Sequence, residues 1–387
     1  MHVGILVAGG YGLGNFGDDA LMVALNEYLR SAVSEKQFAF YCDAAPYLKS
    51  LIGEAAVMDR RGRSSVTCDL LVYGGGTQFY SFPRTRARYL PSLSWQRVRR
   101  GADPRMLVEA VARRLRRFDP MSAIRYRAAI GVGIGVGPFV AGSLEKRRAD
   151  NALRAMSHCI VRDARSYAYA MDIRGGEGCA LGTDLCYTPA FVERIARARR
   201  SGEMTRRIGI IVRDWTHTEQ GRAYYSPLLQ ASAELVKRGY GVDYFLFSEP
   251  AEQEWAKLLA RETYSVRTWR PDEHTLGDFA RAVGECDLVI TARFHGAVFA
   301  TLLGVPCICI EVEQKLEIAR EQYQSLKRWG YPFRAEDLVS DVEDRFSRYA
   351  TEAAGVREDL RRHAALGAQM SESFGMLLRE QPGRLGA

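Results

Sequence analysis

Short apolar runs alternate with helix-like stretches along most of the chain. The runs are bounded by glycine, asparagine or aspartate, which is typical of buried strands that end in turns. Between the runs, apolar residues recur three and four positions apart, as from Asp19 to Leu29, and this spacing predicts amphipathic helices. Alternating strands and helices indicate a parallel sheet that is covered on both faces. In the first half of the chain the predicted strands are His2 to Ala8, Phe38 to Cys42, Asp69 to Tyr73, Ala129 to Val136 and Cys159 to Arg162.

The second half of the chain repeats this architecture from about Arg206 onward. The polar, arginine-rich stretch 194–207 is the predicted linker between the halves. We therefore expect an α/β protein of two doubly wound, Rossmann-like domains, 1–200 and 201–340, that face each other across a cleft, followed by a C-terminal helical tail at 341–387. The strands predicted for the second domain are Arg207 to Val212, Val242 to Phe247, Asp287 to Thr291 and Pro306 to Glu311.

Length and composition agree with two folded domains. A single hydrophobic core rarely organises 387 residues, and 47% apolar with 26% charged residues excludes a disordered or coiled-coil protein. The eight cysteines form no CxxC pair, so we expect buried free thiols rather than zinc ligands or disulfides. The longest weakly polar run, 128–141, is shorter than a membrane span, and the N-terminus does not have the pattern of a signal peptide. These features predict a cytoplasmic protein.

The net charge of +8 is concentrated in one insertion. Residues 84–127 contain thirteen arginines and three acidic residues, a net charge of +10, so the rest of the chain carries −2. This distribution argues against a general nucleic-acid-binding protein. Within the insertion, 106–118 has the pattern of a basic amphipathic helix. Two interpretations stay open: a solvated helix packed by one apolar stripe, or peripheral contact with anionic lipid headgroups at the inner face of the cell membrane.

Two glycine-rich loops are candidates for ligand contact. The loop 9–19 lies between a strand and a helix, but it lacks the lysine of a phosphate-binding loop, and its acidic pair at the helix start would repel a phosphate. Its Asn15 and Asp18 could instead hold sugar hydroxyls, and Asp18 could equally be a helix cap. Gly75 and Gly76, after another strand, allow close approach of a ligand or form an ordinary turn.

Arginines follow one strand in each half of the chain. Arg162 ends an apolar strand, where its planar fork could bind a carboxylate or phosphate. The alternative is an ion pair with Asp163 or Asp184. Arg213 repeats the pattern in the second half, with the same alternative.

The segment from 287 to 310 is the most informative. An apolar strand ends, Arg293 and His295 stand on the following loop, and an apolar helix begins at Gly296. A histidine at such a position suits proton transfer better than core packing. Lys315 follows the next strand and can reach the same pocket. Together with Arg162, these residues suit a small polyanion.

These motifs resemble the polysaccharide pyruvyl transferase family, in the family's order, from residue 9 to about 318. The resemblance implies a fold like that of the two-domain glycosyltransferases. It further implies transfer of a carboxyethylidene group from phosphoenolpyruvate to a hydroxyl pair of a cell-surface or exopolysaccharide glycan precursor, without a metal or other cofactor. The pieces that match are Asn15-Phe-Gly17-Asp18-Asp19, the triple glycine 74–76, Val-Arg162-Asp163 with Ser166, Gly182-Thr-Asp184, Val-Arg213, Arg293-Phe-His295, Gly304-Val-Pro306 and Lys315.

The resemblance also implies roles for single residues. His295 is our hypothesis for the acid/base, and Arg162, Arg293 and Lys315 match donor-binding positions. The chain departs from the family at Thr77-Gln78-Phe79, which leaves the acceptor, a sugar or a lipid-linked glycan, open. The residues expected at an acceptor or secondary site are Asn15, Asp18, Gly75, Gly76, Asp184 and Arg213.

Two other functions stay open at this point. A nucleotide-sugar-dependent glycosyltransferase would share the two-domain fold and a cleft lined by arginine and histidine. A non-catalytic relative would bind an anionic glycan or membrane surface through the basic insertion, and His295 would then be dispensable.

Overall fold

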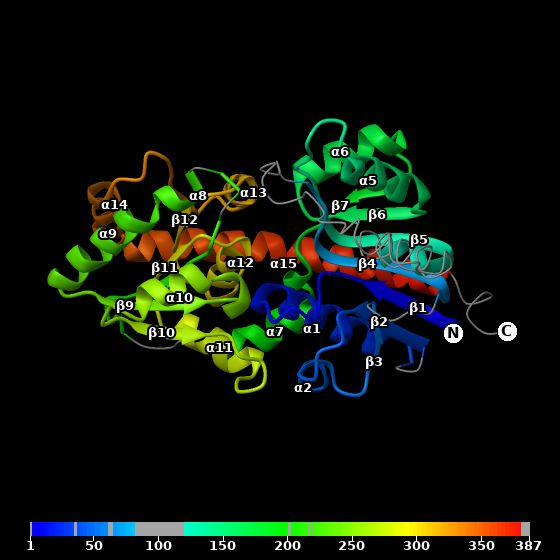
Figure 1. Ribbon diagram of the computed structural model, residues 1–387, viewed down its shortest axis with the longest axis horizontal. Coiled ribbons are helices and arrows are strands. Elements are labelled where there is room, and N and C mark those ends of the chain that lie inside the picture. Colours follow the sequence, from blue (N-terminus) through cyan, green and yellow to red (C-terminus); the bar gives the residue numbers. More distant parts are fainter. Residues whose placement is uncertain are drawn as a thin grey trace, which may run out of the picture.

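The computed structural model describes residues 2–34, 37–60, 65–81, 120–199, 203–215, 217–218 and 220–380. These residues form two α/β domains that lie side by side (Figure 1). The predicted basic helix at 106–118 and the rest of the basic insertion up to residue 119 lie outside them.

The first domain is built on a parallel sheet whose described strands are ordered β3-β2-β1-β4-β5-β6-β7. The order reverses between β1 and β4, which is the switch point where ligands bind in such sheets. The strands are β1 His2–Ala8, β2 Phe38–Cys42, β3 Ala56–Asp59, β4 Val66–Phe79, β5 Ile124–Val136, β6 His158–Val161 and β7 Cys179–Leu181, and the helices are α1 Phe16–Ala32, α2 Leu48–Ile52, α5 Leu144–Ala155, α6 Ala164–Arg174 and α7 Pro189–Ala196.

The second domain repeats this plan with the strand order β10-β9-β8-β11-β12-β13 among the described residues, again all parallel. The prediction of two doubly wound domains is therefore confirmed. The strands are β8 Arg207–Ile211, β9 Gly241–Leu246, β10 Ser265–Thr268, β11 Leu288–Thr291, β12 Cys307–Ile310 and β13 Lys327–Trp329, and the helices are α8 Gln220–Ala223, α9 Tyr225–Lys237, α10 Gln253–Leu259, α11 Leu276–Gly284, α12 Phe294–Leu303, α13 Gln314–Gln322, α14 Ala335–Ser347 and α15 Tyr349–Arg379.

Some predicted boundaries were wrong. The triple glycine is not a loop, because β4 continues through it to Phe79. The predicted linker begins inside α7, which ends at Ala196. The sequence pattern missed the outermost strands β3, β7, β10 and β13, because each has only three or four residues and is partly exposed, so none of them offers a long apolar run. The eight cysteines are free, and seven of them are buried, as predicted.

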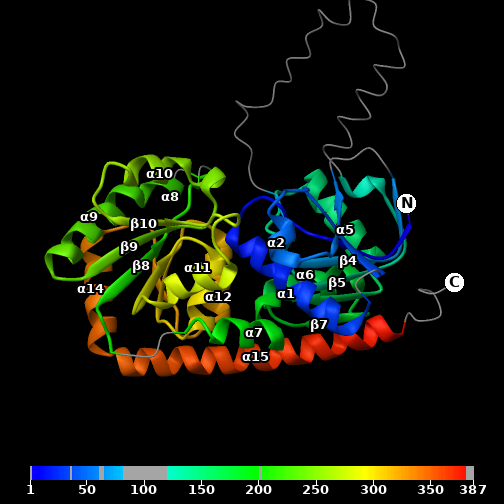
Figure 2. The same ribbon diagram turned by 90° about the horizontal axis from the view of Figure 1, so that it is seen from below.

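Helix α15 runs along both domains and joins them (Figure 2). On the second domain, the Asp359 carboxylate accepts hydrogen bonds from the backbone N–H groups of Gln324 and Ser325, at 3.0 and 2.8 Å. On the first domain, the Tyr28 hydroxyl of α1 donates to the Ser371 carbonyl at 2.6 Å. Within the described residues, no helix is long and apolar enough to cross a membrane.

The N-terminal end of α1 inserts into the second domain. Phe16 is fully buried, and its ring centre lies 4.5 to 5.1 Å from those of four aromatic residues of that domain. Its backbone N–H donates to a carbonyl there at 2.9 Å. Three residues further on, the Asp19 carboxylate accepts a hydrogen bond from Trp269 Nε1 at 2.9 Å. The four aromatic residues are Phe247, Trp269, Phe279 and Phe299.

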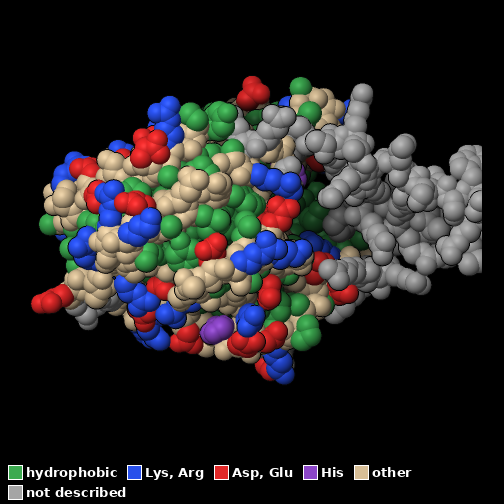
Figure 3. Space-filling view, turned by 60° about the vertical axis from the view of Figure 1, so that its left-hand side comes forward, with side chains coloured by type: hydrophobic (Ala, Val, Ile, Leu, Met, Phe, Trp, Pro, Cys, Tyr) green, Lys and Arg blue, Asp and Glu red, His purple; other side chains and the backbone are tan. Residues whose placement is uncertain are grey.

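Surface charge is mixed over the second domain. On the face shown in Figure 3, Lys and Arg side chains alternate with Asp and Glu, and the described part shows no large area of one sign. This agrees with the nearly balanced charge of the chain outside 84–127.

Candidate functional site

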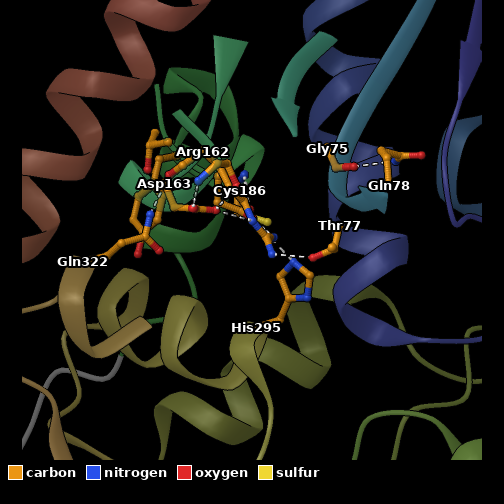
Figure 4. Close-up of polar contacts among 12 residues, drawn as sticks. Gly75, Thr77, Gln78, Arg162, Asp163, Cys186, His295 and Gln322 are labelled. Atoms are coloured by element: carbon orange, nitrogen blue, oxygen red, sulfur yellow. Dashed lines mark hydrogen bonds and ion pairs between the residues drawn. The ribbon is translucent and has the colours of Figure 1, made fainter. Parts of the chain in front are cut away.

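Three predicted site residues meet where the carboxyl ends of the two sheets come together. Arg162 follows β6, and Asp184 precedes the short 3-10 helix η4 (Leu185–Tyr187) of the first domain. His295 lies in the first turn of α12 of the second domain. Arg162 Nη1 donates to Asp184 Oδ2 at 3.1 Å, and His295 Nε2 lies 3.7 Å from the same oxygen (Figure 4). Asp184 thus joins one basic group from each domain.

The Arg162 guanidinium is almost completely buried, with only 4% of the side chain exposed. Its Nη2 donates to Thr77 Oγ1 at 2.9 Å, and its central carbon lies 4.2 Å from the ring centre of Phe294. Nε has no hydrogen-bond partner among the described residues, and Asp163 Oδ2 is 3.8 Å from it. A buried charged donor without a partner is unfavourable, so this geometry favours an anionic ligand.

Asp184 is an ionised carboxylate. Burial by itself would raise the pKa of Asp184, but its contacts with His295 and Arg162, and the backbone N–H of Cys186, outweigh burial and hold the pKa below its usual value. At 3.7 Å, the distance from His295 Nε2 to Asp184 Oδ2 is too long for a hydrogen bond, and His295 Nε2 has no hydrogen-bond partner in the described part of the chain. The imidazole therefore keeps a ring nitrogen for a substrate.

The first turn of α1 packs against His295. A side chain on Gly17 would overlap the His295 ring, so the close approach of the two domains here requires glycine. Asn15 is the helix cap, since its side chain accepts a hydrogen bond from the Gly17 N–H at 3.0 Å. The cap is therefore Asn15 and not Asp18, which is partly exposed on the first turn of α1.

Lys315, at the start of α13, interacts electrostatically with charged groups of both domains. Although the residue keeps part of its surface exposed, burial lowers the pKa of its ammonium group to about 8. Glu313 opposes this change, Arg213 and Arg162 add to it, and Asp18 opposes it weakly. Charged groups of both domains therefore affect the pKa of Lys315, which is mostly protonated at neutral pH.

Arg213 and Glu313 form an ion pair on the second-domain side. The Arg213 guanidinium also lies 4.6 Å from the centre of the Trp215 ring. The Glu313 side chain is 1% exposed, and its Oε2 has no hydrogen-bond partner among the described residues. Sequence reasoning anticipated Arg213 but not its partner.

Arg293 does not join the Arg162 cluster through any described contact. Its guanidinium is ion-paired with Glu252, which is fully buried. Burial raises the pKa of Glu252, although Arg293 acts to lower it. The Arg293 backbone N–H donates to Thr291 Oγ1 at 3.0 Å. Arg293 thus fixes the turn that leads into His295, and its side chain is engaged away from the predicted donor cluster.

Gly75 and Gly76 are packing positions in β4. Both are buried and have positive φ angles of 63° and 67°. A Cβ on Gly75 would lie 2.6 Å from Leu185, and one on Gly76 would lie 3.2 Å from Leu21. The hydrophobic core therefore occupies the space that a ligand would need at these Cα atoms, which counts against the predicted acceptor contact.

Sequence reasoning missed several residues of the site. In the sequence Thr77 stands out only as a departure from the family, yet its hydroxyl accepts a hydrogen bond from Arg162. Phe294 stands between two predicted residues, and its ring faces the same arginine. Glu252 and Glu313 gave no signal, because a carboxylate after a strand is common on any protein surface.

The fold and the cluster at the strand ends define a two-domain α/β protein with a candidate site where the two domains meet. The family model for polysaccharide pyruvyl transferases matches residues 15–314, and the chain belongs to this family. A search of curated proteins gives no match.

Solved structures of the same fold are remote in sequence. The HepE protein of Anabaena in complex with UDP and glucose is 12% identical with a TM-score of 0.54, over 99% of this chain and 100% of that one. The UDP-GlcNAc 2-epimerase of Neisseria meningitidis bound to UDP-GlcNAc is 9% identical with a TM-score of 0.56, over 98% and 100%. A glycosyltransferase from Rickettsia africae is 12% identical with a TM-score of 0.53, over 98% of each chain. At these identities the likeness concerns the fold alone.

Proposed function

We propose that the protein transfers the carboxyethylidene group of phosphoenolpyruvate to two hydroxyls of a sugar in a glycan precursor, which forms a cyclic pyruvate ketal. The observation that supports this most is the buried Arg162 guanidinium, whose Nε has no hydrogen-bond partner among the described residues. Arg162 shares Asp184 with His295, and its charge acts on Lys315. Membership of the polysaccharide pyruvyl transferase family supports the same substrate pair.

The net reaction balances without a redox partner. Both sugar oxygens form bonds to C2 of phosphoenolpyruvate, and the C2–O bond to phosphate breaks. One hydroxyl proton ends on C3, which becomes the methyl group, and the other leaves with the phosphate. As proposed, His295 carries these protons, since its Nε2 has no hydrogen-bond partner among the described residues and lies 3.7 Å from the carboxylate oxygen that also binds Arg162. No cofactor beyond the donor is needed for this balance.

Phosphoenolpyruvate carries a carboxylate at one end and a phosphate ester at the other, and basic groups suit both of these anions. Arg162 offers N–H groups of a planar fork that no described residue accepts, and Lys315 offers an ammonium group that is mostly protonated at neutral pH. Both would place the donor and offset the charge that develops on the leaving phosphate. Arg293 acts in this proposal through the turn that it holds with Glu252, and not as a direct donor ligand.

The acceptor side is proposed to include Asp18, Asp184 and the Arg213–Glu313 pair, whose carboxylates can accept hydrogen bonds from sugar hydroxyls. A lipid-linked precursor in the cytoplasm, with the insertion 84–127 against an anionic membrane, stays a prediction. Vesicle flotation of the full chain and of a chain in which the arginines of 84–127 are replaced by glutamine would test it.

The donor is tested by ligand stabilisation of the folded protein. Thermal unfolding is measured with phosphoenolpyruvate, with UDP- and GDP-sugars, and without ligand, in the wild type, Arg162→Ala and His295→Ala. A ligand at a hundred times its Kd adds about 2.7 kcal/mol to the free energy of unfolding, so a true donor is visible. Stabilisation by phosphoenolpyruvate that Arg162→Ala abolishes supports the proposal.

The second candidate is a nucleotide-sugar glycosyltransferase, which the fold of the UDP-bound neighbours favours. Stabilisation by a nucleotide sugar alone would establish this alternative and would remove the donor roles proposed for Arg162 and Lys315.

A further inference from the structure

Three neighbouring strands of the first domain contribute to the position of one guanidinium. Thr77 of β4 is paired with Gly135 of β5, and Arg162 follows β6, where its backbone N–H donates to the Ile134 carbonyl at 3.0 Å. The Arg162 side chain therefore starts beside β6 and reaches Thr77 two strands away. To do so, it must cross β5 next to Gly135.

Gly135 leaves the room for this crossing. A Cβ on Gly135 would lie 2.9 Å from Arg162 Nε and 3.2 Å from Nη2, which is closer than carbon and nitrogen atoms pack. The guanidinium cannot retreat easily, because Asp184 holds Nη1 at 3.1 Å and the Phe294 ring lies 4.2 Å from its central carbon. Any side chain at Gly135 would therefore turn the plane of the guanidinium.

Thr77 fixes the other end of the fork. Its Oγ1 accepts a hydrogen bond from Nη2 at 2.9 Å, as the dashed line in Figure 4 shows. With one N–H of Nη1 and one of Nη2 engaged, Nε and the second N–H of each Nη have no hydrogen-bond partner in the part of the chain that the structure describes. These are the groups that a planar anion, such as a carboxylate, binds in a two-pronged way.

We propose that Thr77 and Gly135 are positioning residues that set the plane of the Arg162 guanidinium for the carboxylate or phosphate of the donor. This inference rests on the proposed function, because it takes Arg162 to be the donor-binding arginine. It also gives a role to Thr77, the residue at which the chain departs from its family, and to a glycine that no sequence motif marked.

The test measures the Kd of phosphoenolpyruvate by isothermal titration calorimetry. Thr77→Val keeps the branched shape but removes the hydrogen-bond acceptor, Thr77→Ser keeps the acceptor, and Gly135→Ala adds the methyl group beside Nε. We expect Thr77→Val and Gly135→Ala each to raise the Kd about tenfold, because a turned guanidinium loses about one charged hydrogen bond to the anion. Thr77→Ser should bind like the wild type. Thr67→Val, at an exposed position of the same strand, is the matched control and should change nothing.

A second arm separates positioning from general damage. In the Arg162→Lys background, which keeps the charge but not the planar fork, Thr77→Val and Gly135→Ala should weaken binding no further, because their effect passes through that fork. Equal weakening in both backgrounds, or wild-type affinity in Thr77→Val, overturns the inference. If Arg162→Ala weakens binding but the two positioning variants do not, only this inference falls. If the wild type itself does not bind phosphoenolpyruvate, the proposed function falls and the inference with it.

Discussion

Phe16→Ala is expected to loosen the contact between the two domains. Phe16 belongs to the first helix of the first domain, but its ring is surrounded by Phe247, Trp269, Phe279 and Phe299 of the second. Truncation of a fully buried phenylalanine removes its burial energy and leaves a cavity, at a loss of about 3–5 kcal/mol. Since domains of this size are stable by about 5–15 kcal/mol, the change is a large fraction of the total.

The consequence for the site follows from the neighbouring residues. Gly17 directly follows Phe16 and packs against the His295 ring. When Phe16 no longer holds α1 in the second domain, the separation of His295 from Asp184 is expected to vary, and binding of an anionic donor should weaken along with stability.

The assay combines urea unfolding, followed by tryptophan fluorescence, with small-angle X-ray scattering of the native protein. Phe38→Ala is the matched control, because Phe38 is also buried but packs inside the first domain. Both variants should lose several kcal/mol, and only Phe16→Ala should increase the radius of gyration. A loss below about 1 kcal/mol for Phe16→Ala, or an unchanged radius of gyration, would refute the argument that this ring joins the domains.

Three further predictions concern charge. Binding of phosphoenolpyruvate should weaken as the pH rises through about 8, where Lys315 loses its proton, and Lys315→Arg should flatten this profile in titrations from pH 6.5 to 9. Glu252→Gln should lower the free energy of unfolding by about 3–5 kcal/mol, because it leaves the buried Arg293 unpaired; a change under 1 kcal/mol would show that the pair is not structural. Burial raises the pKa of Asp19 from 3.8 to about 7 despite hydrogen bonds from Trp269 and Tyr47, so the folded state binds the proton more tightly. Stability should therefore fall as the pH rises from about 4 to 7, and Asp19→Asn should remove that part of the pH dependence of the melting temperature.

The sequence by itself determined the two parallel sheets and the location of the candidate site. Buried central strands need continuous apolar runs, and parallel strands need helices to connect them. Both domains can therefore be predicted from the alternation of these patterns in the sequence. Because ligands bind beyond the carboxyl ends of such strands, Arg162, Arg293, His295 and Lys315 stood out at those ends. Outer strands such as β3 and β10 could not be predicted, since each has only four residues and is partly exposed, which leaves no long apolar run.

Only the tertiary structure decided which of these residues act together. Arg162 meets Thr77 from 85 positions away, whereas Arg293 is neutralised by Glu252 from 41 positions away, and no spacing in the chain distinguishes the two arginines. The room for the Arg162 side chain depends on the absence of a Cβ at Gly135, a property of packing across three strands. Local sequence sets helices, strands and the residue at the end of each, because these depend on near neighbours. The partner of a buried charge depends on segments that are distant in the chain, so the packing of both domains determines which residue it is.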